Sequence, residues 1–311
     1  MDKIICILGP TASGKTALSV RLAQRYDGEV ISCDSMQVYR GMDIGTAKPT
    51  EEEMGGVVHH MLSVADPNEA FSVGKYVEMA SPILQDVLAR GKTAIICGGT
   101  GLYMDSLMQG QQFAPQGDEA LRKELEHRAD TEGMEALLRE LQTIDPATAQ
   151  RLHLLDRKRI LRALEVYYAT GEPISVHNER TASLPPQYAP LRLGLWFSNR
   201  KELYERIDKR VLLMLEQGLL QEIQGLLDSG ADTQSTAMQA IGYKEFLLYL
   251  EGKESLDDAV KAVQQGSRRY AKRQMTWFHR RDDICWLDRS ILTQEADVFS
   301  AARQELTNFL G

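Results

Sequence analysis

The 311-residue chain has no apolar run that approaches the ~20 residues needed to span a membrane. We expect no signal peptide, because the apolar run at the N-terminus is short and a phosphate-loop pattern follows at once. Cysteine is scarce. The four cysteines are widely scattered and form no CxxC pair, which argues against a disulfide framework or a zinc site. We therefore expect a cytoplasmic protein with reduced thiols and no membrane contact.

Positive charge is also in deficit. The 36 lysines and arginines are outnumbered by 44 aspartates and glutamates, which gives a net charge of −8. A protein that coats nucleic acid without specificity would normally be basic, so any nucleic-acid partner must be met by a local patch. The rest of the composition is that of an ordinary globular protein, 43% hydrophobic and 26% charged, with length enough for one large α/β domain or two smaller ones.

Strand-like and helix-like stretches alternate through the N-terminal third of the chain. Short apolar runs predict strands at residues 3–8, 29–32 and 93–97, and longer stretches predict helices at residues 16–26 and 71–90. This alternation is typical of an α/β fold with a parallel sheet flanked by helices.

The pattern changes between residues 111 and 190. Charge-rich helical segments are separated there by turn signals, and a Pro-rich stretch at residues 184–190 predicts a linker. We expect a mostly helical insertion domain over residues 111–190, within a core formed by residues 1–110 and 191–311. After the insertion, the sequence predicts a strand at residues 191–197 and long helices at residues 201–217, 219–229 and 255–281.

One motif, G-x-x-x-x-G-K-[ST], follows the first predicted strand and opens a predicted helix. Its residues are Gly9, Pro10, Thr11, Ala12, Ser13, Gly14, Lys15 and Thr16. In such a phosphate loop the glycines let the backbone wrap around a phosphate, and the N–H groups at the helix start point at the anion. Lys15 adds a charge, and the Thr16 hydroxyl can hold Mg²⁺. The motif predicts a P-loop NTPase-like core that binds a polyphosphate, but it does not say which one.

A loop of this kind in an ATP-hydrolysing protein usually has a companion strand that ends in Asp. Here the apolar run at residues 94–97 ends in the sequence GGTG, which counts against a standard ATPase. A carboxylate, Asp34, instead stands just past the predicted strand at residues 29–32, where open α/β sheets gather their active sites. Taken alone, Asp34 would be interpreted as a helix cap or a turn residue.

Further blocks of sequence change that interpretation. Together with the phosphate loop they resemble the tRNA dimethylallyltransferase (tRNA isopentenyltransferase) family, and they occur in the order found in that family. The additional blocks are residues 34–49, 98–103, 162–166, 239–245 and 269–278. Six separate blocks make the resemblance specific, which a lone phosphate loop would not have been.

The resemblance implies an activity. Members of the family transfer the dimethylallyl group of dimethylallyl diphosphate to N6 of adenosine 37, beside the anticodon of tRNAs that read codons starting with U. The phosphate loop would then hold the diphosphate of an isoprenoid, with Mg²⁺, rather than ATP. That would explain why no Asp follows residues 94–97. The expected partners are the tRNA anticodon stem-loop and dimethylallyl diphosphate, and we expect a monomer because a single chain can enclose the site.

The resemblance also implies catalytic roles. Asp34 matches the position of the general base that accepts a proton from the adenine amine, and Thr100 matches a residue that contacts the target nucleotide. An arginine from the predicted helix at residues 201–217 would stabilise the diphosphate. Arg210 is favoured over Arg206, although a solvated helix surface is about as good an explanation for either one.

By the same resemblance, a larger set of residues is expected to bind tRNA. These are Asp34, Ser35, Met36, Gln37, Thr100, Arg122, Lys158, Arg159, Ile160, Leu161, Arg162, Gln239, Gly242, Tyr243, Lys244, Lys272, Arg273, Gln274 and Trp277. Two locally basic windows, residues 151–162 and 268–281, support contact with a phosphate backbone. One such window alone is usually a solvated face, and Trp277 is as well explained by packing as by stacking.

Three other functions share part of this pattern. A small-molecule kinase uses the same loop but gives no reason for two basic windows in an acidic chain. An isopentenyltransferase acting on free adenine nucleotides would share Asp34 and Lys15 without needing the helical insertion. A nucleotide-dependent switch or RNA-binding module would tolerate the loss of Asp34.

Overall fold

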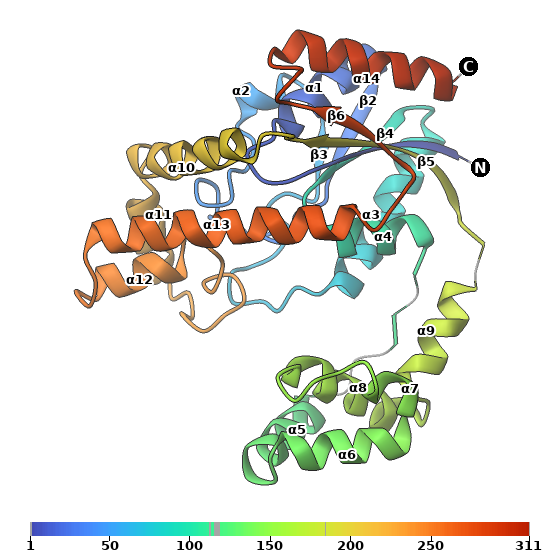
Figure 1. The fold of residues 1–311 in the computed structure, drawn as a ribbon, viewed down its shortest axis with the longest axis vertical. Coiled ribbons are helices and arrows are strands. Elements are labelled where there is room, and N and C mark those ends of the chain that lie inside the picture. The colour runs from blue at the N-terminus through green and yellow to red at the C-terminus, as the bar shows by residue number, and fades with distance from the viewer. Residues whose placement is uncertain (1, 112, 115–118, 184, 311) are drawn as a thin grey trace. The chain divides into compact units, whose positions relative to one another are not determined.

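The computed structural model describes residues 2–111, 113–114, 119–183 and 185–310. Within these ranges six strands form one sheet in the order β3-β2-β4-β1-β5-β6, and all neighbouring strands are parallel (Figure 1). The strands are β1 (Asp2–Leu8), β2 (Gly28–Ser32), β3 (His59–His60), β4 (Thr93–Gly98), β5 (Tyr188–Trp196) and β6 (Ile284–Asp288). The α/β class predicted from the sequence is confirmed.

Helices cover both faces of this sheet. The helices that flank it are α1 (Lys15–Arg25), α3 (Val73–Ala89), α4 (Gly101–Gln109) and α14 (Glu295–Leu310). Ile5 and Ile7 of the central strand pack with α1 and α14 in one apolar cluster. Cys6 points to the opposite face, since side chains alternate along a strand, and its Sγ lies 3.6 Å from Sδ of Met108 on α4. Burial on both faces explains why the strands are continuous apolar runs.

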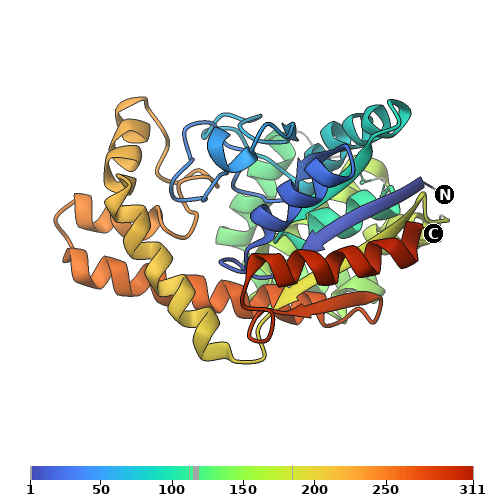
Figure 2. The ribbon, with the colours of Figure 1, turned by 90° about the horizontal axis from the view of Figure 1, so that it is seen from above.

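The phosphate loop leads from β1 directly into α1, which is the arrangement of a P-loop NTPase-like core. The remaining helices of the α/β core lie to one side of the sheet (Figure 2). They are α10 (Arg200–Glu216), α11 (Leu219–Asp228), α12 (Lys244–Leu250) and α13 (Leu256–Phe278), with a short α2 (Glu51–Met54) elsewhere. Helix α13 packs against both α10 and α12. Asn199 and Ser255 cap α10 and α13 through their side-chain oxygens.

The chain divides into two compact units, residues 1–110 with 187–311, and residues 111–186. The described part of the second unit is helical and has an apolar core of its own, which includes Leu137, Leu141 and Ile160. Its helices are α5 (Glu119–Thr131), α6 (Met134–Ile144), α7 (Pro146–Ala149), α8 (Arg157–Thr170) and α9 (Ile174–Ala182). In the described ranges no helix is both long and apolar enough to cross a bilayer.

One local prediction was wrong. Strand β5 begins at Tyr188, so residues 188–190 form strand rather than the end of a linker. They extend the pairing with β1, in which Ile4 lies opposite Pro190. A proline is tolerated near the beginning of a strand, where the loss of one backbone donor costs least.

A buried carboxylate, Glu29, stabilises the edge of the sheet at which the strands begin. Glu29 of β2 accepts hydrogen bonds from Arg90 Nη1 and Nη2, at 2.5 and 2.8 Å, and lies 2.8 Å from His60 Nε2. These contacts, chiefly the bonds from Arg90, lower the pKa of Glu29 to about 2 against the opposing effect of burial. The ionised form of Glu29 is therefore the form that the fold stabilises.

We expect Glu29→Gln to lower the free energy of unfolding by about 2 kcal/mol at neutral pH, because it removes charge-assisted hydrogen bonds from a buried position. The native carboxyl is the stronger acid, so its contribution is complete above pH 4.5 and is lost as the pH falls toward 2. Urea unfolding at several pH values measures both effects. The exposed Asp86→Asn, which also contacts Arg90, is the matched control. Equal stability of Glu29→Gln and wild type at neutral pH would contradict the assignment.

Candidate active site at the carboxyl edge of the sheet

Three loops leave the carboxyl ends of neighbouring strands β1, β2 and β4 and approach each other closely. At Gly98 a Cβ atom would lie 2.0 Å from the carbonyl oxygen of Cys33, and at Gly99 it would lie 2.1 Å from Nε2 of Gln274. At Gly98 a side chain would collide with backbone, so only glycine allows this approach, whereas at Gly99 a side chain would displace the amide of Gln274. The GGTG sequence therefore lets the loop after β4 lie against the segment that begins at Asp34.

The phosphate loop is wound tightly at the start of α1. Ala12 and Gly14 adopt left-handed backbone conformations, with φ of 64° and 92°. The carbonyl oxygen of Pro10 accepts hydrogen bonds from the buried Ser13 hydroxyl and from Lys15 Nζ, both at 2.8 Å. The loop thus folds back on itself and presents the amino end of α1, where free N–H groups favour an anion.

Charged groups of both signs surround this loop. Burial lowers the pKa of Lys15 to about 8 and also lowers the pKa of Arg210, while the negative charge of Asp34 opposes both shifts. The three side chains are therefore close enough to sense one another in a partly dry site. An anion that entered it would meet two cations that are partly withdrawn from water.

Helix α10 brings both candidate arginines to the phosphate loop. Arg206 Nε donates to the carbonyl oxygen of Ala12 at 2.9 Å, and Arg210 Nη1 donates to the Thr11 hydroxyl at 3.3 Å. Arg206 is exposed and lies over the ring of Phe197, whereas Arg210 is the more enclosed of the two. The spacing of one helical turn, read from the sequence, thus corresponds to two side chains that contact one loop.

Asp34 is oriented by its own backbone. Its Oδ1 accepts hydrogen bonds from the amides of Met36, at 2.9 Å, and Gln37, at 3.4 Å, while no residue in the described ranges donates to Oδ2. The Thr100 hydroxyl accepts from the amide of Ser35 at 3.1 Å. The turn at residues 34–37 is therefore tied to the loop after β4, and one carboxylate oxygen remains available.

Helix α13 joins two of the loops. Gln274, which was expected to bind tRNA, is buried, accepts from the Thr11 amide through Oε1 and donates from Nε2 to the carbonyl of Gly99, both at 3.0 Å. Trp277 packs against Gly101, leaving no room for a Cβ, and donates from Nε1 to Asp105. Gln274 thus connects the phosphate loop to the loop after β4, and Trp277 packs beside it against the start of α4.

Sequence reasoning missed two residues of this site. Tyr270 of α13 lies near the Thr100 side chain, and burial raises its pKa. Glu222 of α11 binds the segment that follows Gln37. Tyr270 lies inside a block that carries the family resemblance, so its position was visible but its contact was not. For Glu222 the only signal was an acidic residue in the first turn of a predicted helix.

The residues expected to bind tRNA differ in how much of their side chains reaches solvent. The exposed ones are Arg122, Lys158, Arg159, Gln239, Lys244, Lys272 and Arg273. The half-buried ones are Asp34, Ser35, Met36, Gln37, Thr100, Leu161, Arg162 and Trp277, and the buried ones are Ile160, Gly242, Tyr243 and Gln274. The buried side chains support neighbours in this conformation and offer no surface to a macromolecule.

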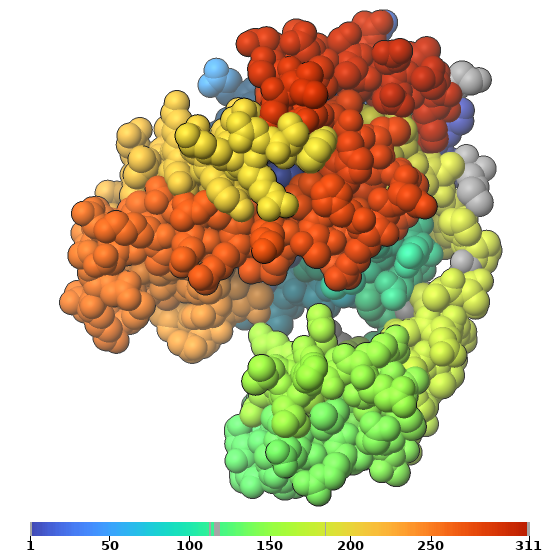
Figure 3. Space-filling view, viewed as in Figure 1, coloured from blue at the N-terminus to red at the C-terminus, as the bar shows by residue number. Residues whose placement is uncertain are grey.

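The basic window at residues 268–281, on α13 and just after it, has fewer unpaired charges than its sequence suggests. Arg268 forms an ion pair with Asp208, and Arg281 pairs with Asp105 and Asp283. The basic side chains that have no carboxylate partner in the described ranges are Arg269, Lys272, Arg273 and Arg280. Helix α13 lies on the face of the molecule turned to the viewer in Figure 3. Partners distant in sequence thus neutralise two of the six charges.

In the second unit a buried carboxylate gathers two of the predicted tRNA-binding arginines. Glu165 accepts from Arg122 Nη2 at 3.0 Å and from Arg162 Nη1 at 2.9 Å. Arg162 also donates to the carbonyl of Ala114 at 2.7 Å. Lys158 and Arg159, one turn earlier on α8, remain exposed.

The described residues include no group of three or more His, Cys, Asp or Glu side chains placed to hold a metal ion. A divalent ion at this site would depend on the Thr16 hydroxyl and on oxygens of a bound phosphate. That donor set suits Mg²⁺, which prefers oxygen ligands and often binds through substrate phosphates.

Family models and known proteins match this chain over nearly its whole length. A model described as IPP transferase matches residues 37–281, and one described as isopentenyl transferase matches residues 2–66. The tRNA dimethylallyltransferase of Acetivibrio thermocellus is 44% identical over 310 residues, which is 99% of each chain. The tRNA dimethylallyltransferase 2 of Geotalea uraniireducens is 49% identical over 286 residues, 92% of each chain.

Solved structures give the same result. The full-length tRNA isopentenylpyrophosphate transferase from Bacillus halodurans superposes with a TM-score of 0.73 at 40% identity, covering 99% of this chain and 98% of that one. A eukaryotic dimethylallyltransferase, solved acting on tRNA, has a TM-score of 0.85 at 32% identity, over 98% of this chain and 78% of that one. By sequence and by fold, the chain belongs to the IPP transferase family, as its motifs suggested.

Proposed function

We propose that this protein transfers the dimethylallyl group of dimethylallyl diphosphate to N6 of adenosine 37 in tRNAs that read codons starting with U. The products are N6-isopentenyladenosine and diphosphate. The observation that carries the proposal is the convergence of Lys15, Arg210 and Asp34 on the carboxyl edge of the sheet. The positive charges of Lys15 and Arg210 suit a diphosphate, and Oδ2 of Asp34, to which no described residue donates, suits an amine.

The end of β4 favours an isoprenoid diphosphate over ATP as the ligand of the phosphate loop. Where phosphoryl-transfer enzymes have an Asp that supports the metal ion, this chain has Gly98 followed by Gly99. Gly98 is required by crowding at the Cys33 carbonyl, and a side chain at position 99 would displace Gln274. The position therefore serves the approach of two loops and leaves no room for a carboxylate side chain.

The chemistry assigns a role to each charged group. The adenine amine is a weak nucleophile, and Asp34 Oδ2 accepts its proton as the bond from N6 to the allylic carbon forms. The bond from that carbon to the diphosphate oxygen breaks, and the electron pair leaves with diphosphate. Lys15, Arg210 and the loop amides stabilise the growing negative charge, with Arg206 at the outer edge of the loop.

A magnesium ion fits the donor chemistry of this loop. The Thr16 hydroxyl has no hydrogen-bond partner among the described residues and would be its protein ligand. The ion, when bound, would offset charge on the diphosphate. Orientation of the amine and removal of its proton remain with Thr100 and Asp34.

The tRNA must give up a base from its stacked anticodon loop, at a cost of a few kcal/mol, before the amine can approach Asp34. Contacts to the phosphate backbone would supply this energy. In the core they would come from Arg269, Lys272 and Arg273 on α13, and in the insertion from Arg122, Lys158 and Arg159. We propose that the protein acts as a monomer, since one chain carries all of these groups.

Asp34→Asn tests the general base. The amide oxygen can still accept from Met36 and Gln37, but it cannot take a proton. We expect the single-turnover rate of dimethylallyl transfer to fall by about 10²- to 10⁴-fold, with the tRNA dissociation constant unchanged. Asp66→Asn, an exposed carboxylate on another loop, serves as the control. A transfer rate equal to that of wild type, or a large loss of tRNA affinity, would remove Asp34 from the base role.

Lys15→Met tests the anion site. Because the pKa of Lys15 is about 8 in the free protein, its ammonium loses charge above that pH, and affinity for inorganic pyrophosphate should fall there. Calorimetry with Mg²⁺ between about pH 7 and 10 should show this decrease in wild type only. We expect Lys15→Met to bind about 10- to 100-fold more weakly at pH 7, and Lys261→Met on α13 to bind normally. Unchanged binding by Lys15→Met would contradict the assignment.

The salt dependence of tRNA binding tests the basic surface of α13. Each phosphate contact contributes about 0.7 to 0.9 to the slope of log affinity against log salt. Replacing Arg269 and Arg273 by Gln should therefore flatten the slope by about 1.4 to 1.8. Arg303→Gln, an exposed arginine on α14, should leave it unaltered. If the double variant keeps the wild-type slope, α13 makes no backbone contact through these residues.

A further inference from the structure

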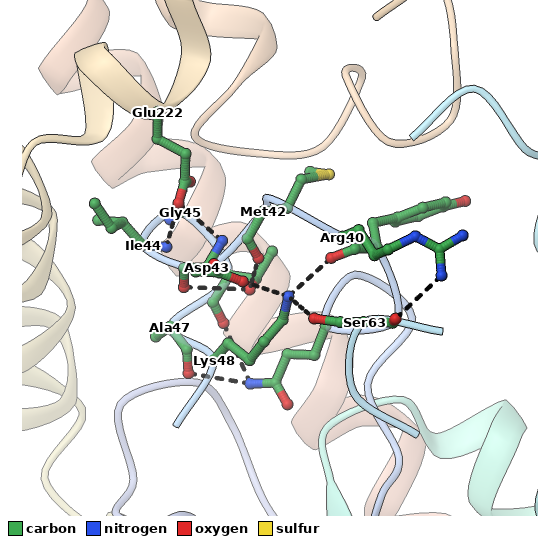
Figure 4. Close-up of polar contacts among 12 residues, drawn as sticks. Arg40, Met42, Asp43, Ile44, Gly45, Ala47, Lys48, Ser63 and Glu222 are labelled. Carbon is green, nitrogen blue, oxygen red and sulfur yellow. Dashed lines mark hydrogen bonds and ion pairs between the residues drawn. The ribbon is translucent and has the colours of Figure 1, made fainter. Parts of the chain in front are cut away.

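Glu222, in the first turn of α11, binds three successive backbone amides. Its Oε2 accepts from the N–H groups of Asp43, at 2.8 Å, and Ile44, at 2.7 Å, and its Oε1 accepts from Gly45 at 3.1 Å (Figure 4). We call these four residues the Glu222 clamp. The partners are about 180 positions apart in sequence. A carboxylate that binds several amides makes strong, charge-assisted hydrogen bonds, so the clamp fixes the backbone at these positions.

Tyr243, which is outside the clamp as defined, supplies a fourth donor to the Glu222 carboxylate. Its buried hydroxyl donates to Glu222 Oε1 at 2.6 Å, and its ring lies against Gly45, where a Cβ would come within 2.5 Å of it. Oε1 thus has two donors and Oε2 has two. All strong acceptor positions of the carboxylate face protein donors, which leaves the side chain one arrangement.

The segment held by the clamp in turn holds Gln37. The Gln37 side-chain amide donates to the carbonyl oxygens of Ala47, at 3.1 Å, and Thr46, at 3.4 Å, and its Oε1 accepts from the Ser32 hydroxyl at 2.9 Å. The backbone amide of Gln37 belongs to the pair that orients Asp34. A continuous path of hydrogen bonds and covalent chain therefore leads from Glu222 to the proposed base.

Lys48 fastens the far end of the same segment. Its ammonium group donates to the Tyr39 carbonyl and the Ser63 hydroxyl, both at 2.8 Å, and to Asp43 Oδ1 at 2.5 Å. Figure 4 shows this group at the centre of the loop, with Glu222 on the opposite side of Asp43. Lys48 closes the loop on itself, whereas Glu222 ties it to α11. Within the described ranges, Glu222 supplies the hydrogen bonds that tie the loop to α11, the helix that follows the arginine-bearing α10.

The geometry points to Glu222 as a positioning residue for the proposed transfer: the clamp holds residues 43–47 against Gln37 and so keeps Oδ2 of Asp34 aimed at the acceptor amine. This inference rests on the proposed function. Glu222 contacts no substrate in this scheme. It acts on the chemical step and leaves the phosphate loop, to which it makes no contact, unaffected.

Glu222→Gln is the sharpest variant, because it keeps the size of the side chain but turns one acceptor oxygen into an NH₂ donor. Either the pair of amides at Asp43 and Ile44 or the donors at Gly45 and Tyr243 must then face that NH₂ group. Asp228→Asn is the matched control, since Asp228 is an exposed carboxylate on the same helix that accepts a hydrogen bond from Gln224, its neighbour one turn away.

Amide hydrogen exchange tests the clamp without any substrate. In wild type the amides of residues 43–45 should exchange slowly, and in Glu222→Gln they should exchange about 10-fold faster or more, with Asp228→Asn like wild type. Exchange of these wild-type amides at the rate of an unstructured peptide would overturn the proposal, whether or not the variant folds. Equal protection in wild type and Glu222→Gln would also overturn it.

Single-turnover kinetics test the positioning role. We expect Glu222→Gln to transfer the dimethylallyl group about 10- to 100-fold more slowly, while its dissociation constant for inorganic pyrophosphate with Mg²⁺ stays at the wild-type value. A merely structural role would slow transfer and also raise the dissociation constant for pyrophosphate, and that result would overturn the proposal. Faster amide exchange with an undiminished transfer rate would overturn it as well. If wild type itself transfers nothing to tRNA, the proposed function fails and the positioning role fails with it, but the exchange data still decide whether the clamp exists.

Discussion

At Gly98, the last residue of β4, the backbone comes so close to the carbonyl oxygen of Cys33 that a Cβ would lie 2.0 Å away. The rest of the site depends on this contact. It lets the Thr100 amide donate to the same carbonyl and the Thr100 hydroxyl accept from Ser35. Asp34 is thereby placed where its charge reaches Lys15 and Arg210, although these residues come from different loops and helices.

The site separates two electrostatic tasks. Close to the sheet, half-buried cations on the phosphate loop and α10 suit a small, highly charged leaving group. On the surface, exposed arginines and lysines on α13 and α8 suit the spread charge of a nucleic-acid backbone in water. Because the net charge of the chain is −8, both tasks would depend on local groups of basic residues. Ion pairs such as Arg268 with Asp208 neutralise others.

Sequence analysis was most successful for features that are contained in short segments of the chain. The phosphate loop, the position of Asp34 past a strand and the two arginines one turn apart are each contained in a short segment, so spacing alone could place them. It could not predict the Glu222 clamp or the bridge made by Gln274, because their partners lie far away in the chain and follow no periodicity. The start of β5 was misplaced for a related reason: proline spacing indicated a linker, but pairing with β1 extended the strand to Tyr188.

The measurement that tests this account most directly is a transfer assay with the purified wild-type protein, Mg²⁺ and labelled dimethylallyl diphosphate. Parallel reactions would contain unmodified tRNA, the same tRNA with adenosine 37 replaced, AMP, or ATP alone. We expect label to move only to the unmodified tRNA and to disappear when adenosine 37 is changed. Label on AMP would identify the acceptor as a free nucleotide, and consumption of ATP with no transfer of label would show that the phosphate loop serves a kinase or an ATPase. Either result would contradict the account.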